Sequence, residues 1–338
     1  GIASTTISQS SFGCADVGPN NVTLTVTDLN GNSQSCIAVV TVSDGTAPTA
    51  VCQNITVQLN ASGTITIDPL DVDGGSSDSC GITSRTLDIS TFDCSNIGAN
   101  TVTLTLADAS GNMTMCTAIV TVEDSIDPIA VCQNITVPLD ASGNVFVTAL
   151  DLDGGSSDNC GINSISISNG LFSCNNVGSN TVTLTVTDTS GNTSSCLATV
   201  TIVDTIAPTV VCQNITVALD ASGNAFINPT NIDGGSSDAC GIASTTISQS
   251  IFDCSNLGPN NVILTLTDLY GNVASCTSVV TVIDTIDPSV TCPTNQTVII
   301  PLGSQYTIPD YFGNGLASAI DNCTDPVTNI TQNPAPGS

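Results

Sequence analysis

The sequence repeats itself every 80 residues. The ten residues GIASTTISQS open the chain at 1–10 and return unchanged at 241–250. Two further phrases keep the same period: VCQNITV begins at residues 51, 131 and 211, and DGGSSD begins at residues 73, 153 and 233. A unit that recurs at a fixed period folds as one small module whose copies stack along the chain. The fold of the whole chain is therefore the fold of one repeat.

Proline-containing phrases mark the boundaries between repeats. Asp44, Asp124, Asp204 and Asp284 are each followed four residues later by a proline. This division predicts three complete repeats and two partial ones. The complete repeats are residues 45–124, 125–204 and 205–284; residues 1–44 match the C-terminal half of a repeat, and residues 285–338 match the N-terminal half of a divergent repeat. We expect the chain to be a stretch of something longer.

The composition favours strands over helices. The chain has one basic residue, Arg85, no His and no Trp, and its net charge of −28 comes almost entirely from Asp, a residue of turns and caps. Val102, Leu104 and Leu106 alternate with threonines, which is the pattern of a strand with one buried face. Six or seven such strands fit in 80 residues. The sequence predicts an all-β fold of tandem immunoglobulin-like sandwiches arranged as an extended rod.

Sixteen cysteines recur with the same period and indicate a disulfide framework in an oxidising compartment. Zinc is disfavoured, because the chain has neither Cys-x-x-Cys pairs nor His. We expect pairing within each repeat, with crossed pairing left open as the alternative. The predicted pairs are Cys52–Cys80, Cys94–Cys116, Cys132–Cys160, Cys174–Cys196, Cys212–Cys240 and Cys254–Cys276, with Cys14–Cys36 and Cys292–Cys323 in the partial repeats.

Charge and composition exclude several classes of function. Nucleic acids and anionic lipids are bound by clustered Lys and Arg, which this chain lacks. No apolar run approaches the roughly 20 residues needed to cross a bilayer, so no membrane insertion is expected in this segment. Without His or Lys, a nucleophile would have no general base except Asp. The chain is not expected to be an enzyme.

Four phrases together resemble the hyalin-type (HYR-like) repeats of large surface proteins of Bacteroidota, among them gliding-motility adhesins. They are the junction D-x-x-x-P, the strand C-Q-N-I-T-V, the loop D-G-G-S-S-D-x-C-G-I and the hairpin V-T-L-T-V-T-D-x-x-G-N. The resemblance covers essentially the whole chain. It implies an immunoglobulin-like fold, export to the cell surface and a role as a stalk or adhesive filament, and it carries over no catalytic residue.

An acidic loop in each repeat is a candidate calcium site. Three side chains within eight residues offer oxygen atoms beside a Gly pair, and calcium prefers several oxygen ligands presented by a flexible turn. The alternative is a solvated turn whose carboxylates accept from local N–H groups. The candidate ligands are Asp71, Asp73 and Asp78 in the first complete repeat, Asp151, Asp153 and Asp158 in the second, and Asn231, Asp233 and Asp238 in the third.

The junctions offer two further candidates. Glu123, Asp124 and Asp127 could hold a cation at the hinge, although Ala207 replaces the third carboxylate at the next junction. The phrase Asp-Ser/Thr-Ile resembles a short O-glycosylation motif of Bacteroidota, and the alternative is a plain β-turn. The hydroxyl residues concerned are Ser125, Thr205 and Thr285.

These observations predict a structural role outside the cell. The leading hypothesis is a stiff stalk region of a secreted cell-surface adhesin, whose partners are neighbouring repeats and lateral copies of the chain. One alternative is a filament subunit completed by half-domain exchange between chains. The other is a ligand-binding module, in which Phe146 and Phe226, out of phase with the core residues of their strands, face outward and contact a neighbour. The adhesive ligand is not predicted.

Overall fold

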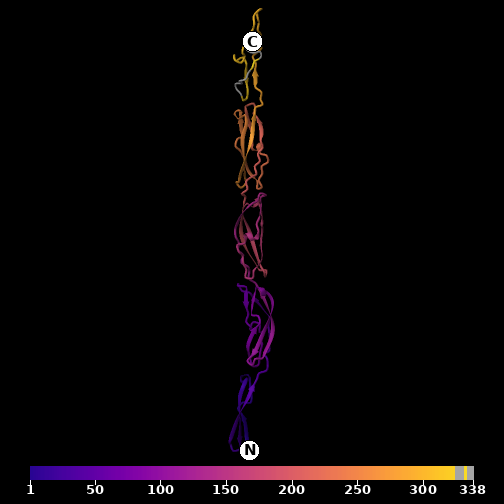
Figure 1. Cartoon of the computed structure of the whole chain (residues 1–338), viewed down its shortest axis with the longest axis vertical. Helices are drawn as coiled ribbons and strands as arrows, with labels where there is room; N and C mark the ends of the chain where they lie inside the picture. Colours follow the sequence, from indigo (N-terminus) through magenta and orange to yellow (C-terminus); the bar gives the residue numbers. More distant parts are fainter. Residues whose placement is uncertain (324–330, 333–338) are drawn as a thin grey trace. The chain divides into compact units, whose positions relative to one another are not determined.

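The computed structural model describes residues 1–323 and 331–332, and it is built almost entirely of strands (Figure 1). Residues 324–330 and 333–338, part of the predicted last half-repeat, lie outside the described residues. The chain divides into two compact units. The first unit is Gly1–Asn134, Thr148–Gly170 and Thr181–Thr199, and the second is Ile135–Val147, Leu171–Asn180 and Val200–Ser338. The division passes through repeat 125–204.

Repeat 45–124 lies within the first unit and shows the fold most completely. A four-stranded sheet has the order β4-β9-β8-β6, with β4 parallel to β9, and β5 pairs with β7 in a second, two-stranded sheet. Its elements are β4 (Ile55–Gln58), β5 (Thr64–Thr66), β6 (Ile82–Leu87), β7 (Thr91–Asp93), the 3-10 turn η2 (Cys94–Asn96), β8 (Gly98–Asp108) and β9 (Met113–Glu123).

The same pattern returns at the equivalent positions 80 and 160 residues later. Two single-turn helices, α1 (Ala149–Leu152) and α2 (Pro229–Ile232), replace the turn at residues 69–72. Repeat 125–204 also contains β10 (Ile135–Pro138), β11 (Asn144–Phe146), β12 (Ile162–Ile167), β13 (Leu171–Ser173), η3 (Cys174–Asn176), β14 (Gly178–Asp188) and β15 (Thr193–Val203). Repeat 205–284 contains β16 (Ile215–Ala218), β17 (Asn224–Phe226), β18 (Ile242–Ile247), β19 (Ile251–Asp253), η4 (Cys254–Asn256), β20 (Gly258–Asp268) and β21 (Val273–Ile283).

The partial repeats keep only some of these strands. Residues 1–44 form a three-stranded sheet, and two short strands pair near the other end of the chain. The first set is β1 (Ile2–Ile7), η1 (Cys14–Asp16), β2 (Gly18–Asp28) and β3 (Ser33–Val42), and the second is β22 (Ser289–Thr291) and β23 (Ser318–Ile320).

The core follows from the alternation in the long hairpin. Val102, Leu104 and Leu106 of β8 are at most 1% exposed, and they share one buried cluster with Val120 of β9 and Phe92 of β7. Side chains from both sheets therefore meet in one core, as in a β-sandwich. Burying each of these large side chains contributes about 1.5–3 kcal/mol. The prediction of disulfide-stapled, immunoglobulin-like all-β repeats is confirmed.

The two phenylalanines that were out of phase do face outward. Phe146 is 69% exposed and lies opposite Leu171, while Phe226 is 70% exposed and lies opposite Ile251. The out-of-phase prediction is correct because each position belongs to the small two-stranded sheet, whose inward side is already filled by the residue after it. Val147 and Ile227 are each 1% exposed.

Candidate functional site: the junctions between repeats

Disulfides within and between repeats alternate along the chain. Cys52–Cys116 closes repeat 45–124 on itself, whereas Cys94–Cys160 joins that repeat to the next one. The same two kinds of bond recur every 80 residues. Within repeats the further pairs are Cys132–Cys196 and Cys212–Cys276, and between repeats they are Cys14–Cys80, Cys174–Cys240 and Cys254–Cys323.

The predicted pairing of Cys52 with Cys80 is therefore wrong, as are its equivalents at Cys132–Cys160 and Cys212–Cys240. Cys52 precedes β4 and Cys80 precedes β6, and these strands lie at opposite edges of one sheet, with β9 and β8 between them. With strands about 4.8 Å apart, such edges are roughly 14 Å from each other. A disulfide needs Cα atoms within about 7 Å.

The pairing of Cys94 with Cys116, and its equivalents Cys174–Cys196 and Cys254–Cys276, fail for a different reason. Gly98, just after the turn that holds Cys94, pairs with Val122, so Cys116 lies six positions back along β9. Six residues of strand span about 20 Å. Cys116 lies instead beside Cys52, because β4 runs parallel to β9 from Ile55 opposite Val120. The crossed alternative for Cys52 is the correct one.

Two cysteines in the described residues are free and exposed, Cys36 and Cys292. The predicted pairs Cys14–Cys36 and Cys292–Cys323 do not form, because Cys14 and Cys323 join neighbouring repeats instead. Cys36 occupies the position of Cys116, and Cys292 the position of Cys52. Bonds of the within-repeat type close 64 residues, and the positions 64 residues before Cys36 and after Cys292 lie outside residues 1–338.

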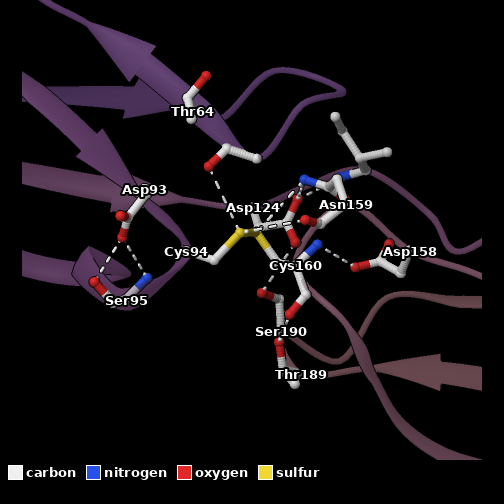
Figure 2. The surroundings of a disulfide bond; sticks show 12 residues. Thr64, Asp93, Cys94, Ser95, Asp124, Asp158, Asn159, Cys160, Thr189 and Ser190 are labelled. Carbon is white, nitrogen blue, oxygen red and sulfur yellow. Dashed lines mark hydrogen bonds between the residues drawn. A yellow bond between two sulfur atoms is a disulfide. The ribbon is translucent and has the colours of Figure 1, made fainter.

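The disulfide Cys94–Cys160 brings the two repeats into direct contact (Figure 2). Cys94 Sγ lies 3.4 Å from the carbonyl oxygen of Asn159, which belongs to the following repeat. The Asn159 amide donates to Asp124 Oδ1 at 3.2 Å, and Asp124 belongs to the linker between the repeats. Linker, loop and disulfide thus meet in one small volume.

The acidic loop splits into two parts with different surroundings. Asp71 Oδ2 accepts from Asp68 N–H at 2.7 Å, and Asp151 and Asn231 accept equivalent bonds from Thr148 and Asn228. This first position caps the local turn. Asp73 accepts from Ser76 N–H at 2.7 Å and from the Arg85 guanidinium at 2.8 Å. In the other repeats, Asp153 and Asp233 accept from the N–H and hydroxyl groups of Ser156 and Ser236.

Those contacts set the pKa of the second loop position. Burial alone would raise the pKa of Asp73, but hydrogen bonds from Ser76 and Arg85 outweigh burial and lower the pKa below its ordinary value of 3.8. The pKa values of Asp153 and Asp233 are also lowered, chiefly by the serine hydroxyls. These carboxylates are ionised and already supplied with donors at neutral pH.

The last loop position joins a different cluster. Carboxylate oxygens of Asp124, Asp158 and Asp188 lie within 4.8 Å of one another. Asp124 comes from the linker, Asp158 from the acidic loop and Asp188 from the turn after β14. Equivalent clusters form at the other junctions from Asp44, Asp78 and Asp108 and from Asp204, Asp238 and Asp268. The structure does not bring the first two loop positions into these clusters, and calcium at the loop triplets stays a prediction.

The hairpin aspartate is fixed by its own turn. Asp188 is fully buried, and it accepts from Ser190 N–H, Asn192 N–H and the Asn192 amide, each at 2.8 Å. The same amide donates to the carbonyl oxygen of Asp124 at 3.1 Å. Asn192 therefore holds the linker against the hairpin. The equivalent amide of Asn112 lowers the pKa of Asp108.

Sequence reasoning placed one residue of this cluster at the junction, Asp124, but grouped it with the wrong neighbours. Glu123 accepts from the Gln58 amide at 2.7 Å, and Asp127 is exposed. The signal that could have identified the cluster is the recurrence of Asp at all three of its positions in each complete repeat. The predicted glycosylation residues Ser125, Thr205 and Thr285 are all exposed, and their modification stays a prediction.

Comparison with known proteins gives one close relationship. No family model matches the chain. Hyalin of Strongylocentrotus purpuratus is 31% identical over 340 residues, an alignment that covers 93% of this chain and 28% of hyalin. The chain therefore spans somewhat more than a quarter of the curated relative that it matches.

Similarity to solved structures is weaker. The immunoglobulin domains 1–5 of Sidekick-1 align with 81% of this chain and 68% of that chain, at 10% identity and a TM-score of 0.34. A variant of titin domains I67–I69 aligns with 70% of this chain and 98% of that chain, at 10% identity and a TM-score of 0.32. Within the residues that the structure describes, no helix is long and apolar enough to cross a membrane. The chain is a homologue of hyalin built from hyalin-type, immunoglobulin-like repeats.

Proposed function

We propose that this chain is a load-bearing stalk segment of a secreted or cell-surface adhesion protein, without catalytic activity. Its similarity to hyalin and its tandem immunoglobulin-like repeats support a role in adhesion. Its seven disulfides require an oxidising compartment, which supports an extracellular location. The observation that carries the proposal is the covalent path formed by the disulfides between repeats.

That path bypasses most of the polypeptide. It enters at Cys14, crosses to Cys80, and then follows only short segments of chain from one inter-repeat disulfide to the next. The segments are 80–94, 160–174 and 240–254, joined by Cys94–Cys160, Cys174–Cys240 and Cys254–Cys323. A pulling force applied along the chain is carried by these segments and disulfides once they are taut, whether or not the bypassed residues stay folded.

The path limits how far the chain can stretch. Its three segments together hold about 45 residues and reach about 150 Å when fully extended, at roughly 3.5 Å per residue. Four disulfides with Cα–Cα distances of 5.0, 5.3, 5.2 and 5.1 Å complete the path. Cys14 and Cys323 can therefore be separated by about 170 Å, whereas the same stretch of reduced chain reaches about 1,080 Å.

Single-molecule pulling from the two ends of the oxidised chain tests this role. We expect the distance from Cys14 to Cys323 to remain below about 170 Å at forces that unfold ordinary immunoglobulin-like domains. After reduction, the same chain should lengthen in steps to several times that value. The double variant Cys94→Ser/Cys160→Ser should gain one added step. An oxidised parent chain that lengthens repeat by repeat would contradict the proposal.

A head-to-tail polymer is the second candidate, and the two free cysteines favour it. Cys36 and Cys292 occupy complementary positions of the within-repeat disulfide, so that the last half-repeat of one chain could complete the first half-repeat of another. Non-reducing electrophoresis of the native protein distinguishes the candidates. Ladders that disappear in the Cys36→Ser variant would indicate a polymer, and a monomer with two titratable thiols would indicate a stalk.

The finer details of the parent protein follow from the resemblance of the repeats. We infer an origin in a large adhesin of the gliding-motility type in Bacteroidota, with lateral copies of the chain as partners. O-glycans at Ser125, Thr205 and Thr285 would extend from exposed positions. Mass spectrometry of peptides from the native protein tests the modification, because unmodified peptides at all three positions would exclude it.

A further inference from the structure

Each acidic cluster combines three carboxylates that are far apart in sequence. In the junction between repeats 45–124 and 125–204, Asp124, Asp158 and Asp188 each bring one oxygen within 4.8 Å of the other two. Calcium binds oxygen at 2.3–2.6 Å, so two oxygens on one ion can be about 5 Å apart at most. The spacing in the cluster meets this limit for all three pairs.

The cluster is also buried without a compensating positive charge. Asp124 is 7% exposed and Asp188 is fully buried. Arg85 is the only basic side chain of the entire sequence, and it is paired with Asp73. Like charges gathered in a poorly solvated place repel one another, and buried ions are unfavourable unless they are paired. The chain itself cannot supply the countercharge here.

An unsatisfied oxygen at each cluster points to a ligand. Asp158 Oδ1 accepts from Cys160 N–H at 2.8 Å, but Asp158 Oδ2 is buried and has no hydrogen-bond partner. The other two clusters each contain one such atom, Asp44 Oδ2 and Asp204 Oδ2. A buried oxygen without a donor is unusual and needs an explanation. Its recurrence at three equivalent junctions indicates the same missing partner each time.

We propose that each of the three clusters binds one divalent cation of the calcium type, which fastens the linker aspartate to the loop and hairpin of the repeat that follows it. The ligands are Asp44, Asp78 and Asp108, then Asp124, Asp158 and Asp188, then Asp204, Asp238 and Asp268. Water and nearby carbonyl oxygens complete the coordination. The disulfide Cys94–Cys160 lies next to the second site, because Cys160 follows Asp158 by two residues. This inference does not depend on the mechanical role.

Asp158→Asn is the sharpest test variant. It keeps the oxygen that accepts from Cys160 N–H, and it replaces the unsatisfied, charged oxygen by an amide. Asp88→Ser is the matched control, because it also removes one carboxylate and repeat 125–204 already has Ser168 at that position. Asp88 and Ser168 accept the same backbone N–H bond, from Thr103 at 2.8 Å and Thr183 at 3.1 Å.

Calorimetric titration of the oxidised full chain with calcium counts the sites. We expect three ions for the parent and for Asp88→Ser, two ions for Asp158→Asn, and none for the triple variant with Asp78→Asn and Asp238→Asn. No uptake by the parent at millimolar calcium would overturn the proposal. Uptake of three ions by Asp158→Asn would overturn it too.

Thermal unfolding separates a ligand from a merely structural carboxylate. In chelator, Asp158→Asn should melt at the same temperature as the parent or higher, because it relieves repulsion. In calcium at matched ionic strength, it should melt lower than the parent, because binding to the folded state stabilises it. A variant that melts lower than the parent by the same amount in both buffers would show that Asp158 only supports its loop.

Discussion

Gly63 is the residue at which one added methyl group would collide with the neighbouring repeat. Its φ angle is +69°, a conformation that favours glycine, and a Cβ atom there would lie 2.7 Å from Cys94 Sγ and 2.8 Å from the carbonyl oxygen of Asn159. Gly143 and Gly223 make equally close approaches at the later junctions. The close packing of repeats around the inter-repeat disulfide therefore depends on glycine at this position.

Gly63→Ala should accordingly lower the stability of the chain by more than the backbone conformation alone explains. Gly111→Ala is the control, because its φ angle is +89° and nothing lies within 4 Å of an added Cβ. The conformational cost in both variants is about 1–2 kcal/mol. In chemical denaturation, Gly63→Ala should lose about 1–3 kcal/mol more than the control. Equal losses would mean that the repeats do not pack closely there.

Arg85 gives a second residue-scale prediction, through the ionisation of Asp73. Repeats 125–204 and 205–284 carry Ile165 and Thr245 at the position of Arg85, so Arg85→Thr is a natural replacement. The pKa of Asp73 is lowered in the folded protein, so its ionised form contributes stability above the unfolded pKa near 4. That contribution disappears as the pH falls through the lower, folded-state pKa.

The free energy of unfolding of Arg85→Thr should therefore be about 1 kcal/mol below that of the parent at pH 6–8. The two proteins should converge in acid, where Asp73 is protonated and the ion pair is lost. Urea titrations across this pH range measure the difference, and a double-mutant cycle with Asp73→Asn isolates the pair. A difference that persists unchanged at pH 2 would assign the effect of Arg85 to packing.

At the scale of elements, the small two-stranded sheet carries an exposed apolar pair. Phe146 and Leu171 are 69% and 64% exposed, and Phe226 and Ile251 repeat the arrangement. The first complete repeat has Thr66 opposite Thr91 instead. Phe146→Thr/Phe226→Thr should leave the free energy of unfolding within about 0.5 kcal/mol of the parent, because exposed side chains contribute little.

The same double variant should weaken lateral association of chains in sedimentation experiments at high protein concentration. Each of the two repeats contributes one aromatic side chain, so the contacts would act together. Leu171→Thr/Ile251→Thr is the matched variant on the facing strand, and it should have the same effect. Association that is unchanged in both variants would remove this sheet from the list of contact surfaces.

The strands could be predicted from the sequence, and the disulfides could not. Alternation of Val102, Leu104 and Leu106 with threonines fixes which side of β8 is buried, because the side-chain period of a strand is two. A repeat period gives no such information about partners. Cys80 lies 66 residues after Cys14 and much nearer to Cys52 in sequence, and both spacings recur throughout the chain. The acidic clusters escaped prediction for the same reason, since Asp124, Asp158 and Asp188 meet only after the linker, loop and hairpin have folded.

At the scale of the whole molecule, the composition makes the chain almost inert to trypsin. Arg85 is its only cleavage site, and this residue lies in β6 with its side chain 29% exposed and paired with Asp73. The folded, oxidised chain should stay intact. In enough urea to open the strand, cleavage after Arg85 should produce the fragments 1–85 and 86–338.

The fragments should remain together until a reductant is added, because Cys52–Cys116 spans the cleavage site. Pairing of Cys52 with Cys80 and of Cys94 with Cys116 would place no disulfide across residue 85, and the fragments would separate without reductant. Electrophoresis of the cleaved protein with and without reductant therefore decides between the two patterns of disulfides. The Arg85→Thr variant should give no fragments in either lane. Fragments that separate under non-reducing conditions would show that the repeat is not closed by Cys52–Cys116.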